Sequence, residues 1–174
     1  MEAKEVIRFS ELDPNFRFEI AREPGGEGIF KCYACGTCTA SCPVRYVNDK
    51  FNPRKIIHMV LLGMREEVLM SDFVWLCATC YSCQERCPQG VKITDIMRAI
   101  QNIAAREGKL IELYRKEVEL LSKLGRLYEI DDFDARKREK AGLPQLKSVN
   151  EELKIIFDET GLSKIAKISS IEGE

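Results

Sequence analysis

The sequence of 174 residues predicts an all-α protein in which helices hold two cysteine-rich loops. Three observations lead to this prediction. Apolar residues recur at helical spacing in most segments, strand-like alternation is nearly absent, and all eight cysteines fall within two short segments. We therefore expect the helices to supply the core and the cysteines to carry the chemistry.

Helical segments are expected before and between the two loops. A short helix is predicted over 14–22, where a proline occupies the first helical position. A helix over 53–62 begins at an Asn-Pro pair, which supplies an N-cap and a suitable first residue, and it ends at Gly63. A capped turn over 71–75 leads into the second loop.

After the second loop the helical pattern continues. Thr94 is expected to cap a helix that has an apolar inner face and ends at Gly108. Another helix is predicted over 110–124. Residues 131–140 are dense in charges of both signs, and 150–160 has the spacing of one more helix.

The cysteines form one pattern twice, C-x2-C-x2-C-x3-C followed by proline. Each member of the second run lies 45 residues after its counterpart, and no cysteine is left over. This spacing is typical of bacterial-type ferredoxins with two [4Fe–4S] clusters, in which every iron takes one thiolate. The two runs are Cys32, Cys35, Cys38, Cys42 with Pro43, and Cys77, Cys80, Cys83, Cys87 with Pro88.

In such ferredoxins the fourth cysteine of each run binds the cluster of the other run. The pattern therefore predicts two ligand sets that exchange one member. One cluster is expected on Cys32, Cys35, Cys38 and Cys87, and the other on Cys77, Cys80, Cys83 and Cys42.

Structural zinc and disulfides are the alternatives to this interpretation. Zinc sites with four thiolates usually use two CxxC pairs, rather than an even triplet and a fourth Cys-Pro. Disulfides belong to secreted chains, but the first ten residues, MEAKEVIRFS, are charged and lack the apolar stretch of a signal peptide. A cytoplasmic iron–sulfur protein is therefore favoured.

The distance between the two runs separates two ferredoxin architectures. The small βαβ type has closely spaced motifs with strands around them, whereas here 34 residues with a helical pattern separate Cys42 from Cys77. The prediction is an alpha-helical ferredoxin with two [4Fe–4S] loops. Its expected parts are an N-terminal segment (1–27), the two-cluster domain (28–108) and C-terminal helices (109–174).

Composition and motifs exclude several functions. The formal net charge of −1 argues against a nucleic-acid or anionic-membrane surface, and the apolar runs are too short for direct membrane insertion. No catalytic residues are predicted, because the sequence has no Ser/His/Asp set and no phosphate, flavin or nicotinamide fingerprint. Substrate chemistry is expected on a partner.

Two segments resemble the C-type subunit of heterodisulfide reductase. They are KCYACGTCTASCPV (31–44) and the stretch 52–100, in which LLG, EEV and S-D-x-x-W-x-C lead into the second loop. The resemblance implies an all-helical two-cluster fold. It also implies electron transfer from a flavin-containing A-type subunit to a catalytic, Cys-rich B-type subunit, where the disulfide of coenzymes M and B is reduced. Relatives serve other complexes, including those of sulfur oxidation.

A free two-cluster ferredoxin and the iron–sulfur subunit of another dehydrogenase are the alternative functions. A diffusible carrier needs only small, polar docking patches. The C-terminal helices instead hold more apolar residues than so small a core is expected to bury, which favours a partner-docking extension. These residues are Leu110, Ile111, Leu153, Ile155, Ile156, Phe157, Leu162 and Ile165.

Overall fold

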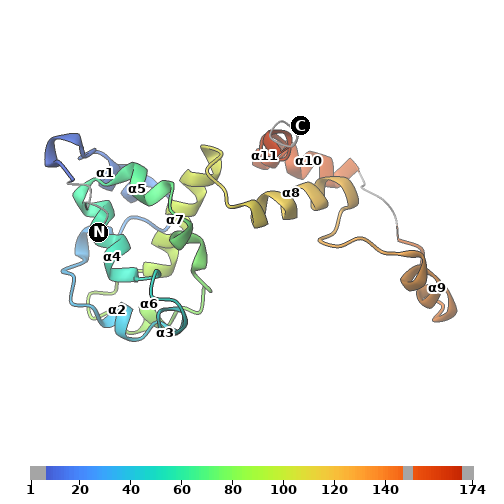
Figure 1. Ribbon diagram of the computed structural model, residues 1–174, viewed down its shortest axis with the longest axis horizontal. Coiled ribbons are helices and arrows are strands. Elements are labelled where there is room, and N and C mark those ends of the chain that lie inside the picture. Colours follow the sequence, from blue (N-terminus) through green and yellow to red (C-terminus); the bar gives the residue numbers. More distant parts are fainter. Residues whose placement is uncertain (1–6, 147–150, 170–174) are drawn as a thin grey trace, which may run out of the picture. The chain divides into compact units, whose positions relative to one another are not determined.

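The computed structural model describes residues 7–146 and 151–169 of the chain. Within these ranges the protein consists of α-helices and short 3₁₀-helices and has no β-strand, which confirms the all-α prediction (Figure 1). The chain forms two compact units, Met1–Lys109 and Leu110–Glu174, and each is described by itself.

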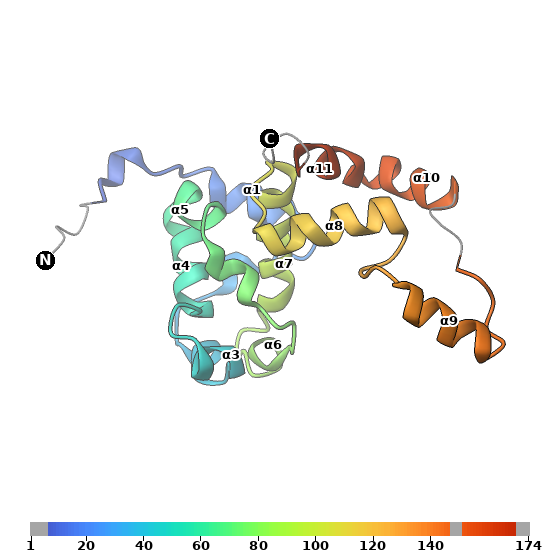
Figure 2. The same cartoon turned by 45° about the vertical axis from the view of Figure 1, so that its right-hand side comes forward.

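The first unit is organised around its two longest helices, α4 and α7. Helices α1 and α5 lie toward one end of them, and α2, α3 and α6 lie toward the other end (Figures 1 and 2). In chain order the elements are η1 (Phe9–Glu11), α1 (Phe16–Arg22), η2 (Ile29–Lys31), α2 (Thr37–Ala40), α3 (Pro43–Val47), α4 (Pro53–Leu62), α5 (Arg65–Leu69), η3 (Asp72–Leu76), α6 (Ser82–Glu85) and α7 (Ile93–Arg106).

Helix α4 begins and ends where the sequence predicted. The Asn52 side chain accepts a hydrogen bond from the Lys55 backbone N–H at 3.0 Å, and Pro53 occupies the first helical position. At the other end, Gly63 is left-handed with a φ of 86°. A Cβ there would lie 2.3 Å from the Asp13 carbonyl oxygen, so the close approach of the two segments requires glycine.

Helix α7 differs from its prediction at the N-terminus. It begins at Ile93, with Lys92 in the capping position, so the prediction that Thr94 caps this helix is wrong. Thr94 lies inside the first turn and is 1% exposed. Its hydroxyl oxygen is 3.6 Å from the Cys83 sulfur, so the side chain is used by the cysteine-rich loop rather than by the helix end.

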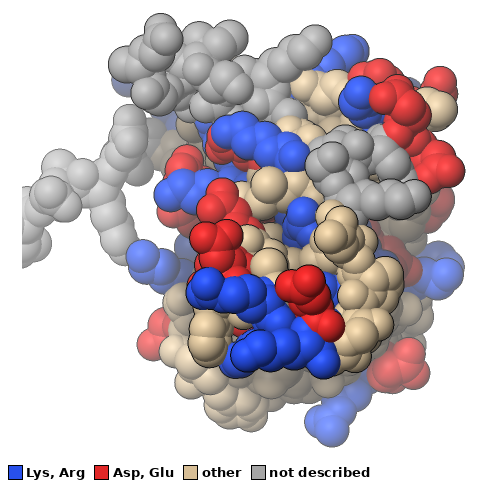
Figure 3. Space-filling view, turned by 90° about the vertical axis from the view of Figure 1, so that its right-hand side faces the viewer, with Lys and Arg blue, Asp and Glu red and all other residues tan. Residues whose placement is uncertain are grey.

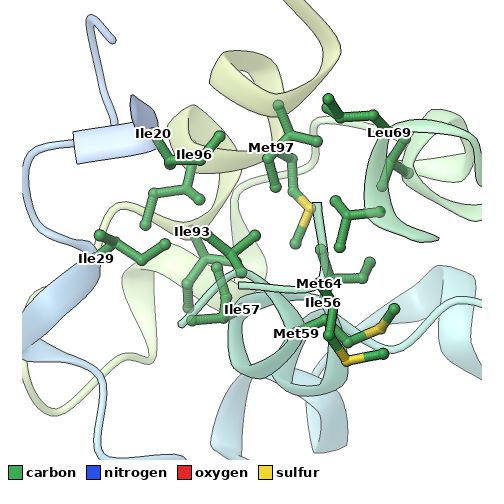
Figure 4. Close-up of a cluster of buried hydrophobic side chains, with 14 of the residues drawn as sticks. Ile20, Ile29, Ile56, Ile57, Met59, Met64, Leu69, Ile93, Ile96 and Met97 are labelled. Carbon is green, nitrogen blue, oxygen red and sulfur yellow. The ribbon is translucent and has the colours of Figure 1, made fainter. Parts of the chain in front are cut away.

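The apolar core lies where α1, α4, α5 and α7 meet, and Figure 4 shows the isoleucine, leucine and methionine side chains that fill it. Ile20, Ile57 and Ile96 are fully buried. Burying an aliphatic side chain of this size contributes roughly 1.5–3 kcal/mol to the stability of the fold. The core therefore fixes how α4 and α7 present the two loops.

An ion-pair network joins α1, α5 and the C-terminal end of α7. The Arg65 guanidinium donates to both carboxylate oxygens of Glu19, at 2.9 and 3.0 Å, and it also pairs with Glu107. Lys109 lies 2.9 Å from Glu66 and 3.0 Å from Glu107. A bidentate arginine that holds two helices is worth more than an isolated surface pair.

We expect Arg65→Met to lower the free energy of unfolding by about 2 kcal/mol, because two carboxylates lose their shared partner. Guanidinium unfolding, followed by circular dichroism under anaerobic conditions, measures the change. Arg8→Met is the matched control, since the Arg8 side chain is exposed and lies 3.8 Å from Glu11. Equal losses in the two variants would contradict a structural role for the network.

The stability lost in Arg65→Met should depend on pH. A hydrogen bond from Arg65 is the main cause that lowers the pKa of the Glu107 carboxyl below its ordinary value. A lowered folded-state pKa means that the stabilisation is present above the ordinary value and is lost as the pH falls through the lowered one. The difference between Arg65→Met and the unchanged protein should shrink accordingly in acid.

The second unit consists of α8 (Glu112–Leu124), α9 (Asp132–Lys140), α10 (Glu151–Thr160) and α11 (Leu162–Ser169). Helix α8 packs on α10 and α11. Helices α8 and α10 match the predicted segments 110–124 and 150–160, although residue 150 lies outside the described residues. Within the described part of this unit Phe157 alone is buried, whereas Ile155 and Ile156 are 60% and 54% exposed.

Acidic and basic side chains lie interspersed on the face that Figure 3 draws. This mixture agrees with the composition, which has 27 Lys and Arg against 28 Asp and Glu. Among the described helices, none combines the length and the apolar character needed to cross a membrane.

Candidate iron–sulfur site

The two cysteine-rich loops have the same backbone conformation. Helices α2 and α6 begin 45 residues apart, at Thr37 and Ser82, and they contact each other. The same offset relates the left-handed residues that precede them, which have φ values between 49° and 88°. These are Ala34 and Gly36 in the first loop and Thr79 and Tyr81 in the second.

Three of these four left-handed residues are not glycine, so the loops hold a conformation that costs about 1–3 kcal/mol at each such residue. Such residues persist where the surrounding structure fixes them, and they cluster at functional sites. Left-handed residues also turn successive peptide N–H groups into a concave surface for anions, which is a common feature of iron–sulfur sites. Both loops are therefore shaped to receive a negatively charged group.

The eight cysteines line two separate cavities, four in each. We call these the first cavity, lined by Cys32, Cys35, Cys38 and Cys87, and the second cavity, lined by Cys42, Cys77, Cys80 and Cys83. Each cavity takes three cysteines from one loop and the fourth from the other. The structure thus brings together the members of each expected ligand set, and ligation itself stays a prediction.

The thiol pKa values in the second cavity reflect the same grouping. Burial is the main cause that raises the pKa of Cys77 and of Cys83, and the charge of Cys42 raises both further. Burial also raises the pKa of Cys38, to about 11. Iron binding must displace these protons, because thiolates are the ligands.

The second cysteine of each run is exposed and lies beside a hydroxyl side chain. The Thr37 hydroxyl lies 3.3 Å from the Cys35 sulfur and is the main cause that lowers the pKa of that thiol. The Cys80 thiol pKa is lowered chiefly by the Ser82 backbone N–H and then by the Ser82 hydroxyl, at 3.6 Å. Hydrogen bonds to a thiolate also stabilise the negative charge of a cluster.

The donor set of each cavity fits a [4Fe–4S] cluster. Four thiolates surround each cavity, as four irons require. Among the described residues, no three His, Cys, Asp or Glu side chains converge as the ligands of a single metal ion do. A zinc ion would instead draw four sulfurs to about 2.3 Å from one centre.

The two cavities are adjacent, because Ile93 lines both of them and is 3% exposed. In Figure 4 it lies beside Ile57, which also lines the first cavity. The Val91 backbone N–H donates to the Cys87 sulfur at 3.3 Å. Ile93 was not predicted as a site residue from the sequence, although it is the first apolar residue of the helix that follows the second loop.

Comparison with known proteins agrees with this geometry. The profile of a family described as a 4Fe-4S dicluster domain matches residues 27–91, which include all eight cysteines. The protein therefore carries two [4Fe–4S] clusters, as the sequence predicted.

Several curated relatives are similar over most of the chain. One is the iron-sulfur C-type subunit of the CoB–CoM heterodisulfide reductase of Methanopyrus kandleri, 34% identical over 96% of this chain and 89% of the relative. Another is a C-type subunit of the same enzyme from Methanocaldococcus jannaschii, 41% identical over 80% and 77%. A third is the C-type subunit of the H(2):CoB-CoM heterodisulfide,ferredoxin reductase of Methanothermobacter thermautotrophicus, 32% identical over 97% and 94%. The chain belongs to the heterodisulfide reductase C-type family of iron–sulfur electron-transfer subunits.

Proposed function

We propose that this chain relays electrons within a heterodisulfide-reductase-like complex, between a flavin-containing A-type subunit and a catalytic, Cys-rich B-type subunit. The observation that carries the proposal is the pair of adjacent four-cysteine cavities that share Ile93. A relay needs two neighbouring redox sites and no substrate site of its own. In this proposal the chain is not catalytic, and the disulfide is reduced on the B-type subunit.

The residues have distinct roles in this proposal. Three cysteines from one loop and one from the other hold each cluster, so that neither loop can move alone. Each [4Fe–4S] cluster supplies a site for one electron. Buried Ile93 excludes water between the two sites. Cys35 and Cys80, which are exposed, give each site its own approach from the surface.

We also propose a division of labour along the chain. Residues 28–108 bind the clusters, after an N-terminal segment of 1–27, and residues 109–174 dock on a partner subunit. The exposed apolar side chains of α8 and α10 support this role. Thiolate-bound clusters also suit a reducing compartment, so we propose a cytoplasmic location.

A freely diffusing two-cluster ferredoxin is the second candidate. The exposure of Cys35 and Cys80 favours it, because transient redox contacts are small. The two candidates are distinguished by anaerobic purification of the tagged chain from native extract, followed by gel filtration and mass spectrometry. The relay proposal expects a flavoprotein and a Cys-rich subunit in constant ratio to the chain. A chain that elutes alone, with all its iron, would favour the ferredoxin.

We expect the anaerobically purified protein to contain about eight irons and about eight acid-labile sulfides per chain, with little zinc. The reason is that all eight cysteines line the two cavities. Metal analysis and visible absorbance measure this directly. Stoichiometric zinc in colourless, iron-replete material would contradict both the cofactor and the relay.

A further inference from the structure

The two cysteine-rich loops are equivalent in backbone but differ in the side chains around their cavities. Each residue of the second loop lies 45 positions after its counterpart, so the two loops can be compared residue by residue. Tyr33 corresponds to Ala78, and Thr37 corresponds to Ser82. Differences between such counterparts are differences in the surroundings of the two sites.

The side chains near the exposed cysteine differ between the two cavities. The Thr37 hydroxyl lies 3.3 Å from the Cys35 sulfur, and Tyr33 lines the same cavity. At Cys80, the Ser82 hydroxyl lies 3.6 Å away, and the counterpart of Tyr33 is an alanine. The first cavity therefore has a tyrosine hydroxyl at a position where the second cavity has an alanine.

The hydrogen-bond contacts of the less exposed cysteine sulfurs do not reverse this difference. In the first cavity, the Val91 backbone N–H donates to Cys87 at 3.3 Å. In the second cavity, the Thr94 hydroxyl lies 3.6 Å from Cys83. These two contacts correspond in number.

The cavities also differ in charge. Arg54 lines the first cavity, donates to the Ala34 carbonyl oxygen at 3.3 Å and forms no ion pair within the described part of the chain. The described residues that line the second cavity include no Lys or Arg. Arg98 stacks on Tyr81 beside it, but the Asp95 carboxylate, 3.9 Å away, offsets that charge.

The rest of the lining is mixed in both cavities. Phe51, Pro53 and Met97 line the second cavity, whereas Gln89 lines the first. Reduction adds a negative charge to a cluster, and this charge is stabilised by hydrogen-bond donors and cations and destabilised by apolar surroundings. Thr79 and Tyr81 add neutral hydroxyl groups to the second cavity, but among the described lining residues only the first cavity has a cation, Arg54, and this charge favours reduction there.

We propose that Tyr33 and Arg54 give the cluster in the first cavity the higher reduction potential, so that an electron entering the chain comes to rest there. This inference rests on the proposed cluster-binding function. One electron leaves the second site and arrives at the first, so one cluster is oxidised and the other reduced, with no bond broken and no proton moved. Tyr33 and Arg54 act as positioning residues that set the order of the two sites.

The test is a redox titration of the full-length, iron-replete protein, with reduction by dithionite and detection by electron paramagnetic resonance. We expect two one-electron midpoints. Tyr33→Phe and Arg54→Gln should each lower the higher midpoint and leave the lower one in place. In the double variant the equilibrium should shift by at least about tenfold, which corresponds to about 59 mV.

The counterpart position supplies the control. Ser82→Ala removes the hydroxyl beside Cys80 and should lower only the lower midpoint. Arg54→Lys keeps the charge and should restore most of the midpoint that Arg54→Gln loses. If Tyr33→Phe moved the lower midpoint, or Ser82→Ala the higher one, the proposed order would be wrong. Unchanged midpoints in iron-replete Tyr33→Phe and Arg54→Gln would overturn the proposal.

The design keeps this proposal separate from the proposed function. Tyr33→Phe removes a single oxygen atom, so it remains informative even if Arg54→Gln fails to retain iron. Loss of the relay function would appear as missing partners in the purified material, with both midpoints intact. Failure of the inference would appear as a wrong or absent shift in a protein that still holds about eight irons.

Discussion

Replacing Cys87 with serine is expected to damage the same cluster as replacing Cys35, although the two residues belong to different loops. Both residues line the first cavity. Iron content should fall from about eight to about four per chain, because one cubane loses a thiolate ligand. The remaining redox signal should be that of the second cavity, so the higher midpoint should disappear.

Double variants make the test sharper. The iron losses of two substitutions should add when they affect separate clusters, and should not add when they affect the same cluster. Cys35→Ser with Cys87→Ser should retain as much iron as either single variant. Cys35→Ser with Cys42→Ser should lose nearly all of it, because Cys42 lines the second cavity. Ligation within each loop would give the reverse result, with the Cys35 and Cys42 variants belonging to one cluster.

Local structure explains why the fourth cysteine of the first run leaves its own loop. Helix α2 ends at Ala40, and Cys42 is extended, with φ −82° and ψ 117°. Pro43 then begins α3 in the first helical position, where its fixed φ is suitable. The chain changes direction at Cys42, and this residue lines the second cavity.

The long helices could be predicted from the sequence because their signals are local. In α4 an Asn-Pro start and a glycine end bracket an apolar face, and tertiary contacts did not alter those boundaries. In α7 the apolar face was predicted, with Ile96, Ile100 and Ile103 buried. The start of α7 was not predicted correctly. Threonine is a common N-cap residue, but the Thr94 hydroxyl lies beside the Cys83 sulfur instead of capping the helix.

The short elements and the loop geometry could not be predicted in this way. Helices α2 and α6 have four residues each, too few for an apolar period, and they depend on the loops around them. Gly36 could suggest a left-handed turn, but its counterpart Tyr81 is left-handed without being glycine. The cysteine spacing predicted the cluster chemistry, whereas Tyr33 and Arg54 required the three-dimensional arrangement.

The second prediction with a large expected effect concerns the proposed docking role of residues 109–174. Helix α8 packs on α10 and α11 within the second unit, so a cut before α8 removes all the described helices of that unit together. This is a cleaner division than a cut after Gly125, which would leave α8 without these helices. A chain ending at Ile111 keeps Lys109 and its ion pairs with Glu66 and Glu107.

The chain that ends at Ile111 should retain about eight irons and both midpoints but should no longer copurify with its partner subunits. The reason is that all eight cysteines precede the cut, whereas the exposed apolar side chains of α8 and α10 follow it. The alignment with the Methanopyrus kandleri relative covers 96% of this chain and so continues beyond the dicluster match at residues 27–91. Such an extension is therefore shared within the family rather than peculiar to this protein.

Point variants separate docking from folding of the second unit. Ile155→Gln with Ile156→Gln changes two exposed apolar residues of α10, whereas Lys154→Gln changes an exposed polar neighbour. The double variant should weaken copurification at least tenfold at unchanged iron content and helical signal, which corresponds to about 1.4 kcal/mol of binding free energy, and Lys154→Gln should have little effect. Full copurification of the shortened chain would rule out the docking role, and loss of its iron would show that the second unit belongs to the cluster-binding fold.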